Sequence, residues 1–135
     1  MTATRDCWKT TPLSHARAEI TLDRSYTLAE FDRIMQGFVP QEMEHKWFIY
    51  YEDPWLYLHR SWTGFCIYQV RFERAGETWR VAEVLVTRDA DQYGGDDDMS
   101  DGLLLAVLLD GQAGRDSGAA WDAYMSAARK GSDLA

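Results

Sequence analysis

The spacing of hydrophobic and polar residues changes several times along the chain, and each pattern predicts a different element. Hydrophobic residues recur at helical spacing over residues 28–38, directly after Thr27 and Glu30, whose spacing is typical of a capping box. Gly37 and Pro40 then disfavour further helix. The first predicted element is a helix with one apolar face.

β-Branched and aromatic runs follow this helix and predict strands. The runs are residues 46–52, 55–60, 65–73 and 78–88. The connections between them contain Asp53-Pro54, Trp62-Thr63 and Ala75-Gly76. Connections this short favour hairpins, so the runs predict a four-stranded antiparallel meander. Two-residue loops would place His59 opposite Cys66 and Tyr68 opposite Glu83.

The last third of the chain predicts an acidic loop and two helices. The loop covers residues 90–100, and the apolar run LLLAVLL at 103–109 predicts a helix that is buried on most sides. Its expected limits are an N-cap at Ser100 or Asp101 and a stop at Gly111. A last helix is expected to be capped by Asp116 or Ser117 and to carry an apolar stripe of Trp121, Tyr124, Met125 and Ala128.

These elements predict an α+β fold: a four-stranded antiparallel meander sheet with about three helices packed on it. A chain of 135 residues is long enough for a single core of this kind. We expect residues 1–24 to form a polar leader, either partly flexible or contributing an edge strand where Ala18, Ile20 and Leu22 alternate. Residues 25–130 form the single domain, and 131–135 are a frayed tail.

Charge and composition narrow the classes of function. The net charge of -8 disfavours binding to nucleic acid or to anionic membranes. No apolar run is long enough to span a membrane, and residues 1–22 lack the apolar centre of a signal peptide, so we expect a cytoplasmic protein. Cys7 and Cys66 are expected to be free thiols.

Neither a metal site nor a cofactor is expected. The cysteines and histidines are too widely spaced for a zinc site. The acidic loop lacks the glutamate spacing of an EF-hand, which favours a solvated loop that ends in a helix cap, with weak calcium or magnesium binding as the alternative. The chain also contains no GxSxG elbow, no HExxH motif and no phosphate-binding glycine loop, and this favours binding over catalysis.

The predicted register brings four polar residues onto one sheet face: Tyr57, His59, Tyr68 and Glu83. Both sheet faces are also predicted to be too apolar for exposure to water, so helices or a partner subunit must cover them. A carboxylate and an imidazole in such a setting need hydrogen-bond partners. One interpretation is a satisfied polar network within an aromatic core, and the other is a pocket in which His59 and Glu83 bind or act as bases.

The segment HRSWTG, residues 59–64, is the other candidate site. Turn formation accounts for Ser61, Thr63 and Gly64. It does not account for Trp62, since an indole at a loop tip favours contact with a neighbouring element or a partner. Arg60 is expected either to pair with acids of the loop at 90–100 or to hold an anionic ligand, the first being favoured.

Residues 25–111 resemble a family of small uncharacterised bacterial domains. The likeness is carried by KWF at the start of the first strand, HRSWTG, the acidic stretch YGGDDD and the LLLAVLL helix. Members of such a family sometimes accompany ADP-ribosylglycohydrolase-type or other nucleotide-metabolism proteins. The resemblance implies an accessory or ADP-ribose-related role, carried by His59 to Gly64.

Two functions remain open at this point. The first is a non-catalytic domain that binds a protein partner or its own copy, as a homodimer, through an aromatic surface near Trp62 and the less covered sheet face. The alternative is a site for a small molecule of the nucleotide or ADP-ribose type, with Arg60 holding the anion, Trp62 or Tyr57 stacking on a base, and His59 with Glu83 as an acid-base pair.

Overall fold

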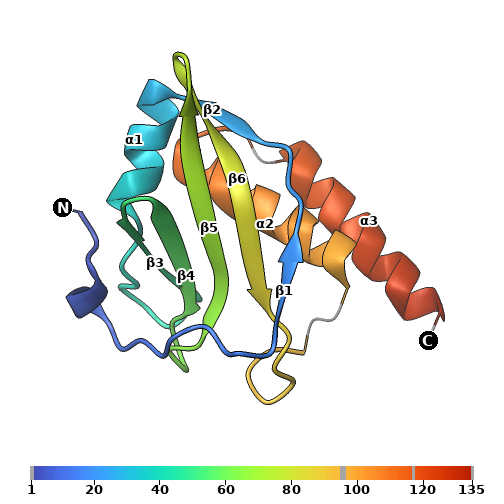
Figure 1. Cartoon of the computed structure of the whole chain (residues 1–135). Coiled ribbons are helices and arrows are strands. Elements are labelled where there is room, and N and C mark those ends of the chain that lie inside the picture. Colours follow the sequence, from blue (N-terminus) through green and yellow to red (C-terminus); the bar gives the residue numbers. More distant parts are fainter. Residues whose placement is uncertain (1, 95–96, 117, 135) are drawn as a thin grey trace.

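A computed structural model describes the backbone of residues 2–94, 97–116 and 118–134, and the side chains of the last helix as far as Ser126. One sheet lies in front of the helices α2 and α3, and α1 packs near one end of it (Figure 1). The elements in chain order are η1 (Arg5–Cys7), β1 (Arg17–Ile20), β2 (Ser25–Thr27), α1 (Leu28–Gln36), β3 (Trp47–Glu52), β4 (Trp55–Arg60), β5 (Cys66–Ala75), β6 (Thr78–Thr87), α2 (Asp98–Ala113) and α3 (Gly118–Leu134). The fold is α+β.

The sheet is antiparallel and has six strands, two more than expected. Strands β3 to β6 form the predicted meander, and the order across the sheet is β1-β6-β5-β4-β3. The two additional strands, β1 and β2, both pair with β6 along its outer edge. Strand β1 contains Ala18 and Ile20, where an edge strand was one of the two expected alternatives. Strand β2 is only three residues long and was not predicted, since so short a segment carries no clear alternating pattern.

The first hairpin has the expected register, whereas bulges change the next two. Phe48 faces His59 across β3 and β4. His59 faces Cys66 as predicted, but Ile67 is an extra residue in β5, so that Leu58 faces Tyr68. The prediction that Tyr68 faces Glu83 is wrong: Tyr68 faces Val86, and Glu83 faces Arg71.

The third hairpin departs from the prediction for two local reasons. Ala75 pairs with Thr78, so the loop consists of Gly76 and Glu77 rather than Ala75 and Gly76. Ala82 is then an extra residue in β6, between the pairs that Val81 and Glu83 make with β5. An extra residue reverses the side-chain alternation beyond it, so Val84 and Val86 face the helices in place of Glu83 and Leu85.

Helix α1 begins with the predicted capping box. The Thr27 hydroxyl accepts the Glu30 N–H at 3.2 Å, and the Thr27 N–H donates to the Glu30 carboxylate at 2.9 Å. The helix ends at Gly37, whose φ of +68° and close approach to the Ile49 carbonyl leave no room for a Cβ atom. Phe31 and Ile34 are buried against the sheet.

Helix α2 is longer at both ends than predicted. Its N-cap is Asp97, whose carboxylate accepts the Met99 N–H at 3.1 Å, and not Ser100 or Asp101. The helix passes through Gly111 and stops at Gly114, which has a φ of +82°. Burial along most of the helix compensates for the weak helix propensity of Gly111.

Arg88 anchors the start of α2 to the end of β6. Its guanidinium donates to Asp98 at 2.5 Å and to Asp101 at 2.6 Å. Together with Asp97 as the cap, these contacts account for the three aspartates at the end of the acidic loop and the start of α2.

Helix α3 follows Asp116, whose carboxylate accepts the Gly118 N–H at 2.9 Å. Ser117 and the side chain of Ala128 lie outside the described residues. The backbone of the tail expected to fray is helical as far as Leu134, where α3 ends. Trp121, with 47% of its surface exposed, contacts Tyr124. No helix in the described ranges is long and apolar enough to cross a membrane.

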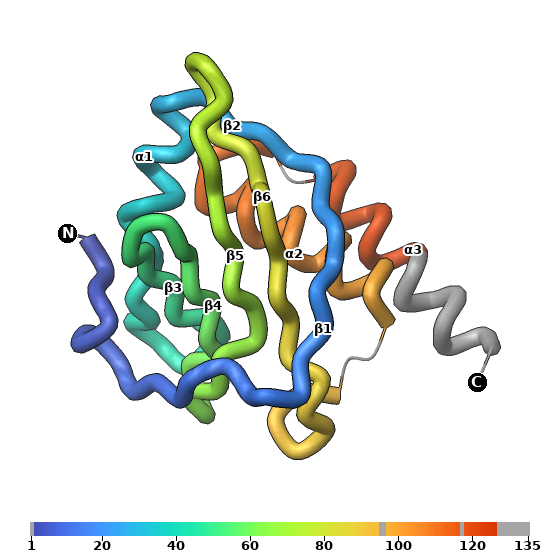
Figure 2. The backbone as a smooth tube through the Cα atoms, in the orientation of Figure 1, coloured from blue at the N-terminus to red at the C-terminus, as the bar shows by residue number. Residues whose placement is uncertain are grey.

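The two faces of the sheet differ strongly. The helices cover one face, and the main core lies between them and the strands. The N-terminal segment, residues 2–16, crosses the β3 and β4 end of the other face (Figure 2), where Ala3, Phe48 and Tyr50 form a second small cluster. Free Cys7 packs beside this cluster.

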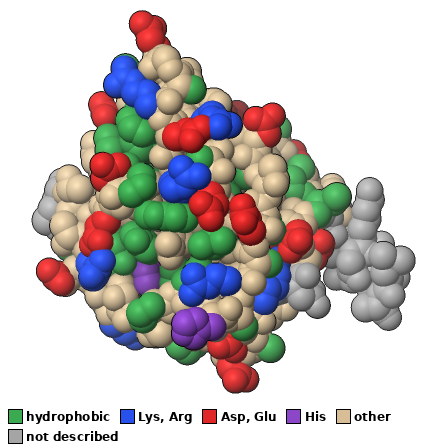
Figure 3. All heavy atoms as spheres, in the orientation of Figure 1, with side chains coloured by type: hydrophobic (Ala, Val, Ile, Leu, Met, Phe, Trp, Pro, Cys, Tyr) green, Lys and Arg blue, Asp and Glu red, His purple; other side chains and the backbone are tan. Residues whose placement is uncertain are grey.

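The remainder of that second face mixes charged and hydrophobic side chains, so the expectation that both faces are too apolar to meet water is wrong. Acidic and basic side chains intermingle across it (Figure 3). Arg71 pairs with Glu73 and Glu83, and Arg80 also pairs with Glu73. The two bulges together cause the difference. The bulge at Ile67 turns Arg71 toward this face, and the bulge at Ala82 turns Glu83 toward it and the valines of β6 toward the core.

Candidate functional site

The HRSWTG segment closes the hairpin between β4 and β5. The Arg60 N–H donates to the Phe65 carbonyl at 2.9 Å, and the Gly64 N–H donates to the Arg60 carbonyl at 2.8 Å. Trp62 and Thr63 are therefore at the tip of the loop. Gly64 has a φ of +81°, and a Cβ atom on it would lie 3.1 Å from the Lys9 carbonyl oxygen. Only glycine fits this position without strain.

Ser61 is a structural residue of the loop. It is buried, and its hydroxyl donates to the His45 carbonyl at 2.7 Å. Its own carbonyl accepts the indole N–H of Trp8 at 2.7 Å. Ser61 thus ties the loop both to the N-terminal segment and to the segment before β3. Thr63 has a local role, since its hydroxyl accepts the Phe65 N–H at 3.3 Å.

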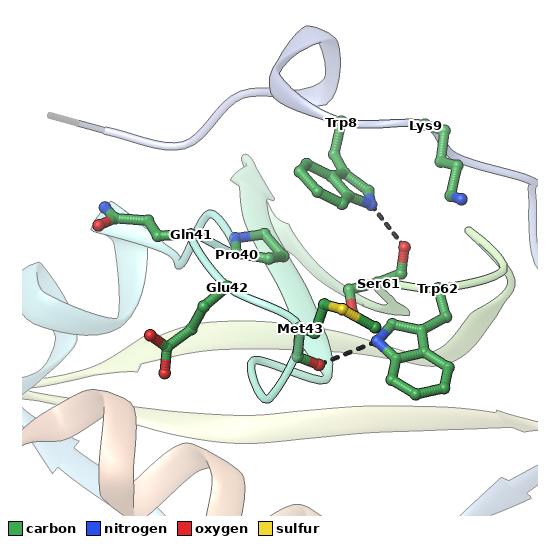
Figure 4. A pocket seen from close by; sticks show the side chains of 8 residues that line it. All are labelled: Trp8, Lys9, Pro40, Gln41, Glu42, Met43, Ser61 and Trp62. Atoms are coloured by element: carbon green, nitrogen blue, oxygen red, sulfur yellow. Dashed lines mark hydrogen bonds between the residues drawn. The ribbon is translucent and has the colours of Figure 1, made fainter.

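Trp62 is the exposed residue of the loop, with 63% of its surface accessible. Its indole N–H donates to the Met43 carbonyl at 3.0 Å, and the Met43 side chain beside it is 74% exposed. A hollow of about 490 Å³ opens here (Figure 4) and is lined by Trp8, Lys9, Pro40, Gln41, Glu42, Met43, Ser61 and Trp62. A second hollow of about 280 Å³ is lined by Lys46, Arg60, Trp62 and Thr63. We call Trp62, Met43 and the two hollows the Trp62 surface.

Arg60 lies over the ring of Trp47, with the guanidinium carbon 4.5 Å from the ring centroid. It makes no ion pair with any described residue, so the expected pairing does not form with Asp97 or Asp98, the two described aspartates of the DDD stretch. Arg88 pairs with Asp98 instead. The reason is topological: β5 separates β4, which carries Arg60, from β6, which leads into the acidic loop.

His59 and Tyr57 belong to a different place, beneath the N-terminal segment. His59 is only 2% exposed, and its Nδ1 lies 2.9 Å from the Gly64 carbonyl oxygen. Its ring stacks on Tyr50 at 5.6 Å, and Tyr50 stacks on Tyr57 at 4.9 Å. Burial lowers the pKa of His59, an effect that the bond to Gly64 only partly opposes. The imidazole is therefore neutral at pH 7.

Tyr68 and Glu83 do not join His59 and Tyr57. The Tyr68 hydroxyl lies on the helix side of the sheet and donates to the Asp101 carbonyl at 2.7 Å. Glu83 lies on the opposite face, where it accepts from Arg71 at 3.2 Å. The bulge at Ile67 turns Tyr68 to the helix side of the sheet. Glu83, on β6, pairs with Arg71 on the neighbouring strand β5 and does not reach β4. The predicted acid-base pair of His59 and Glu83 does not form.

Cys66, which faces His59, does not supply a nucleophile. Burial raises the pKa of the Cys66 thiol to about 12. The thiol donates to the Tyr68 carbonyl at 3.3 Å, so it remains protonated at neutral pH. A neutral histidine beside a protonated thiol favours binding rather than covalent chemistry.

Several residues of these sites were not predicted from the sequence. Trp8, Lys9 and Met43 contribute to the Trp62 surface, and Arg5 and Gln69 line the space near His59. The one usable signal was Trp8, since a tryptophan in an otherwise polar leader needs a surface to pack on. Arg5, Lys9 and Met43 lie well before the HRSWTG loop in sequence and approach it only in the folded chain, and Gln69 reaches this face only because of the bulge at Ile67.

No protein-family model, curated protein or solved structure matches the chain. The resemblance of HRSWTG and its neighbours to small bacterial domains therefore stays a prediction.

Proposed function

We propose that this protein is a non-catalytic binding protein that recognises a protein partner through the Trp62 surface. The observation that carries this proposal is the state of the Trp62 indole: it is mostly exposed, yet its N–H is bonded at 3.0 Å to Met43. The indole is held in place without being covered.

An indole held in this way is suited to binding. Fixing a side chain before association reduces the conformational entropy lost on binding. Tryptophan is also among the residues that contribute most to protein interfaces when a partner covers them. Because the Trp62 N–H already has an acceptor in Met43, a partner can cover the ring without leaving a polar group unsatisfied.

The charges around Trp62 favour a partner segment that is acidic as well as apolar. Lys46 and Arg60 line the smaller hollow, and Lys9 lines the larger one together with Glu42. This basic rim stands out in a chain of net charge -8. A partner with an aliphatic or aromatic side chain next to carboxylates would match both the indole and its rim.

A second copy of the chain is a less favoured occupant. The homodimer was expected because both sheet faces looked apolar. One chain covers its own apolar face with helices, and the rest of the second face carries ion pairs. We assign the protein to the cytoplasm on its two free thiols.

The smaller hollow supports a second candidate, a ligand of the nucleotide or ADP-ribose type. Two cations and an indole line the same 280 Å³ space. In this alternative a base stacks on Trp62, and Arg60 and Lys46 hold phosphate oxygens. His59 and Glu83 take no part, because neither lines this hollow.

A peptide-display selection tests the proposal. Random peptides would be selected on the wild-type protein, with counter-selection on Trp62→Ala. Trp121→Ala is the matched control, since Trp121 is also exposed but lies on α3. We expect enriched peptides with acidic residues beside an aromatic or aliphatic one, which bind wild type and Trp121→Ala and lose at least about tenfold in affinity for Trp62→Ala.

The other outcomes separate the alternatives. Peptides that bind Trp62→Ala as well as wild type contradict the proposal. A melting temperature raised by ADP-ribose or ATP in wild type, but not in Arg60→Ala, favours the nucleotide candidate. Sedimentation that shows a concentration-dependent dimer, lost in Trp62→Ala, favours the homodimer.

A further inference from the structure

His59 carries an unpaired nitrogen in the interior. Its Nδ1 contacts the Gly64 carbonyl oxygen, which only accepts, so the proton of the neutral ring is on Nδ1. Nε2 is then an acceptor with a lone pair. It is buried and has no hydrogen-bond partner. A buried acceptor without a partner is costly, and such groups in native proteins usually have a specific explanation.

His59 lines a cavity between the N-terminal segment and the sheet. Its volume is about 320 Å³, which is within the range of small-molecule sites. Arg5, Thr10, Pro12 and Leu13 form the side of the N-terminal segment, and Tyr50, Tyr57, His59, Cys66 and Gln69 form the side of the sheet. We call this space the N-terminal cavity.

The N-terminal segment is fixed at several points, so the cavity is preformed. The Thr11 N–H donates to the Gly64 carbonyl at 2.8 Å, and the Cys66 N–H donates to the Thr11 carbonyl at 3.3 Å. Arg5 pairs with Glu52 at 2.5 Å at the other side. Because Glu52 already neutralises Arg5, the cavity does not select an anion.

Two more polar side chains of the cavity have no partner. Neither the amide of Gln69 nor the hydroxyl of Tyr57 bonds to a described residue, and both can donate to a carbonyl oxygen. The stacked rings of Tyr50, Tyr57 and His59 lie within 17° of parallel from one ring to the next. Flat aromatic rings beside a cavity favour a flat ligand.

We propose that the N-terminal cavity binds a small planar heterocycle in which an N–H stands next to a carbonyl, the chemistry of a pyrimidine base or another cyclic amide. The N–H donates to Nε2 of His59, and the carbonyl accepts from Gln69 or Tyr57. This site is separate from the Trp62 surface and does not depend on the function proposed for that surface. Binding involves no change in covalent bonds.

Uracil and 1,3-dimethyluracil test the inference as a matched pair, because methylation removes both N–H donors and keeps the flat ring with its carbonyls. The two would be titrated into the full-length ¹⁵N-labelled protein while the imidazole nitrogen signals are followed by NMR. We expect uracil to move the His59 Nε2 signal saturably and to leave those of His15 and His45 unchanged. Dimethyluracil should bind at least about tenfold more weakly, the value of one lost hydrogen bond.

Variants of the cavity complete the test. Gln69→Leu should weaken uracil binding by about tenfold if the amide donates to the carbonyl, whereas Arg74→Ala, farther along the same strand, should bind as wild type does. His59 signals that do not move at millimolar uracil would overturn the inference. Equal affinity for uracil and dimethyluracil would overturn it too, since Nε2 would then play no part. Gln69→Leu avoids the risk that His59 variants fail to fold.

Discussion

The Nδ1 nitrogen of His59 lies 2.9 Å from the carbonyl oxygen of Gly64, five residues later in the chain. The same oxygen accepts the N–H of Thr11 at 2.8 Å. One carbonyl therefore joins the HRSWTG loop, the N-terminal segment and the histidine of the N-terminal cavity. It also sets the tautomer of His59 and leaves Nε2 as a buried acceptor without a hydrogen-bond partner.

The first prediction concerns the pH dependence that His59 gives to stability. Burial lowers its pKa in the folded protein, while the unfolded chain keeps a value near about 6.5. Between these two pKa values only the unfolded chain binds the proton, so the free energy of unfolding falls as the pH drops below about 6.5. Urea unfolding at several pH values from about 7.5 down to 5.5 measures this slope.

His59→Gln should remove most of that slope, while His15→Gln should keep it. The comparison uses slopes rather than absolute stabilities, because His59→Gln also loses the bond to Gly64. If His59→Gln and wild type lose stability in parallel over this range, the histidine is not the group responsible.

The second prediction concerns the hydroxyl of Tyr68. This side chain is fully buried, and its O–H donates to the Asp101 carbonyl at 2.7 Å. Tyr68→Phe removes this buried hydrogen bond and should cost about 1 to 2 kcal/mol in thermal or urea unfolding. Tyr57→Phe is the matched control: its hydroxyl bonds to no described residue, and the change should stay within about 0.5 kcal/mol. Equal effects of the two variants would refute the assignment.

The third prediction compares two glycines. Gly64 has a φ of +81° and lies close to the Lys9 carbonyl, so Gly64→Ala should destabilise by about 1 to 2 kcal/mol. Gly111 lies inside α2, and a Cβ atom there meets nothing within 4 Å. Gly111→Ala should therefore stabilise by about 0.5 to 1 kcal/mol. Melting temperatures that shift in the same direction for both variants would be inconsistent with this loop geometry.

The fourth prediction concerns stability in acid. Arg115 donates to Glu30 at 2.5 and 2.8 Å and also to the Ser25 carbonyl. Its hydrogen bond to the carboxylate lowers the pKa of Glu30 to about 2. The stabilisation is present above about pH 4.5 and is lost as the pH falls toward 2. Because the pair is partly exposed, we expect about 1 to 2 kcal/mol.

Glu30→Gln should lower stability at pH 7 and flatten the loss between pH 4.5 and 2. Glu77→Gln, in the exposed turn between β5 and β6, is the control and should follow wild type at every pH. A wild-type acid profile that Glu30→Gln reproduces unchanged would place the effect elsewhere.

Local patterns determined much of the fold. The Thr27 and Glu30 capping box, the β-branched runs and the LLLAVLL segment marked α1, the four strands of the meander and α2, because each depends on residues that are close in sequence. The HRSWTG loop was located for the same reason: its geometry depends on Gly64 and on a bond from Gly64 to Arg60, within the loop itself.

Tertiary structure alone decided which side chains meet. The β5 and β6 strands each contain one extra residue, Ile67 and Ala82. Because of these bulges, Tyr68 and Glu83 lie on opposite faces of the sheet, and the predicted polar group with His59 does not form. The position of Trp8 over Ser61 and of Arg5 near Tyr50 depends on contacts across more than 40 residues of chain. A bulge reverses every side chain beyond it, and contacts between distant segments leave no periodic trace, so neither is visible in the order of residues.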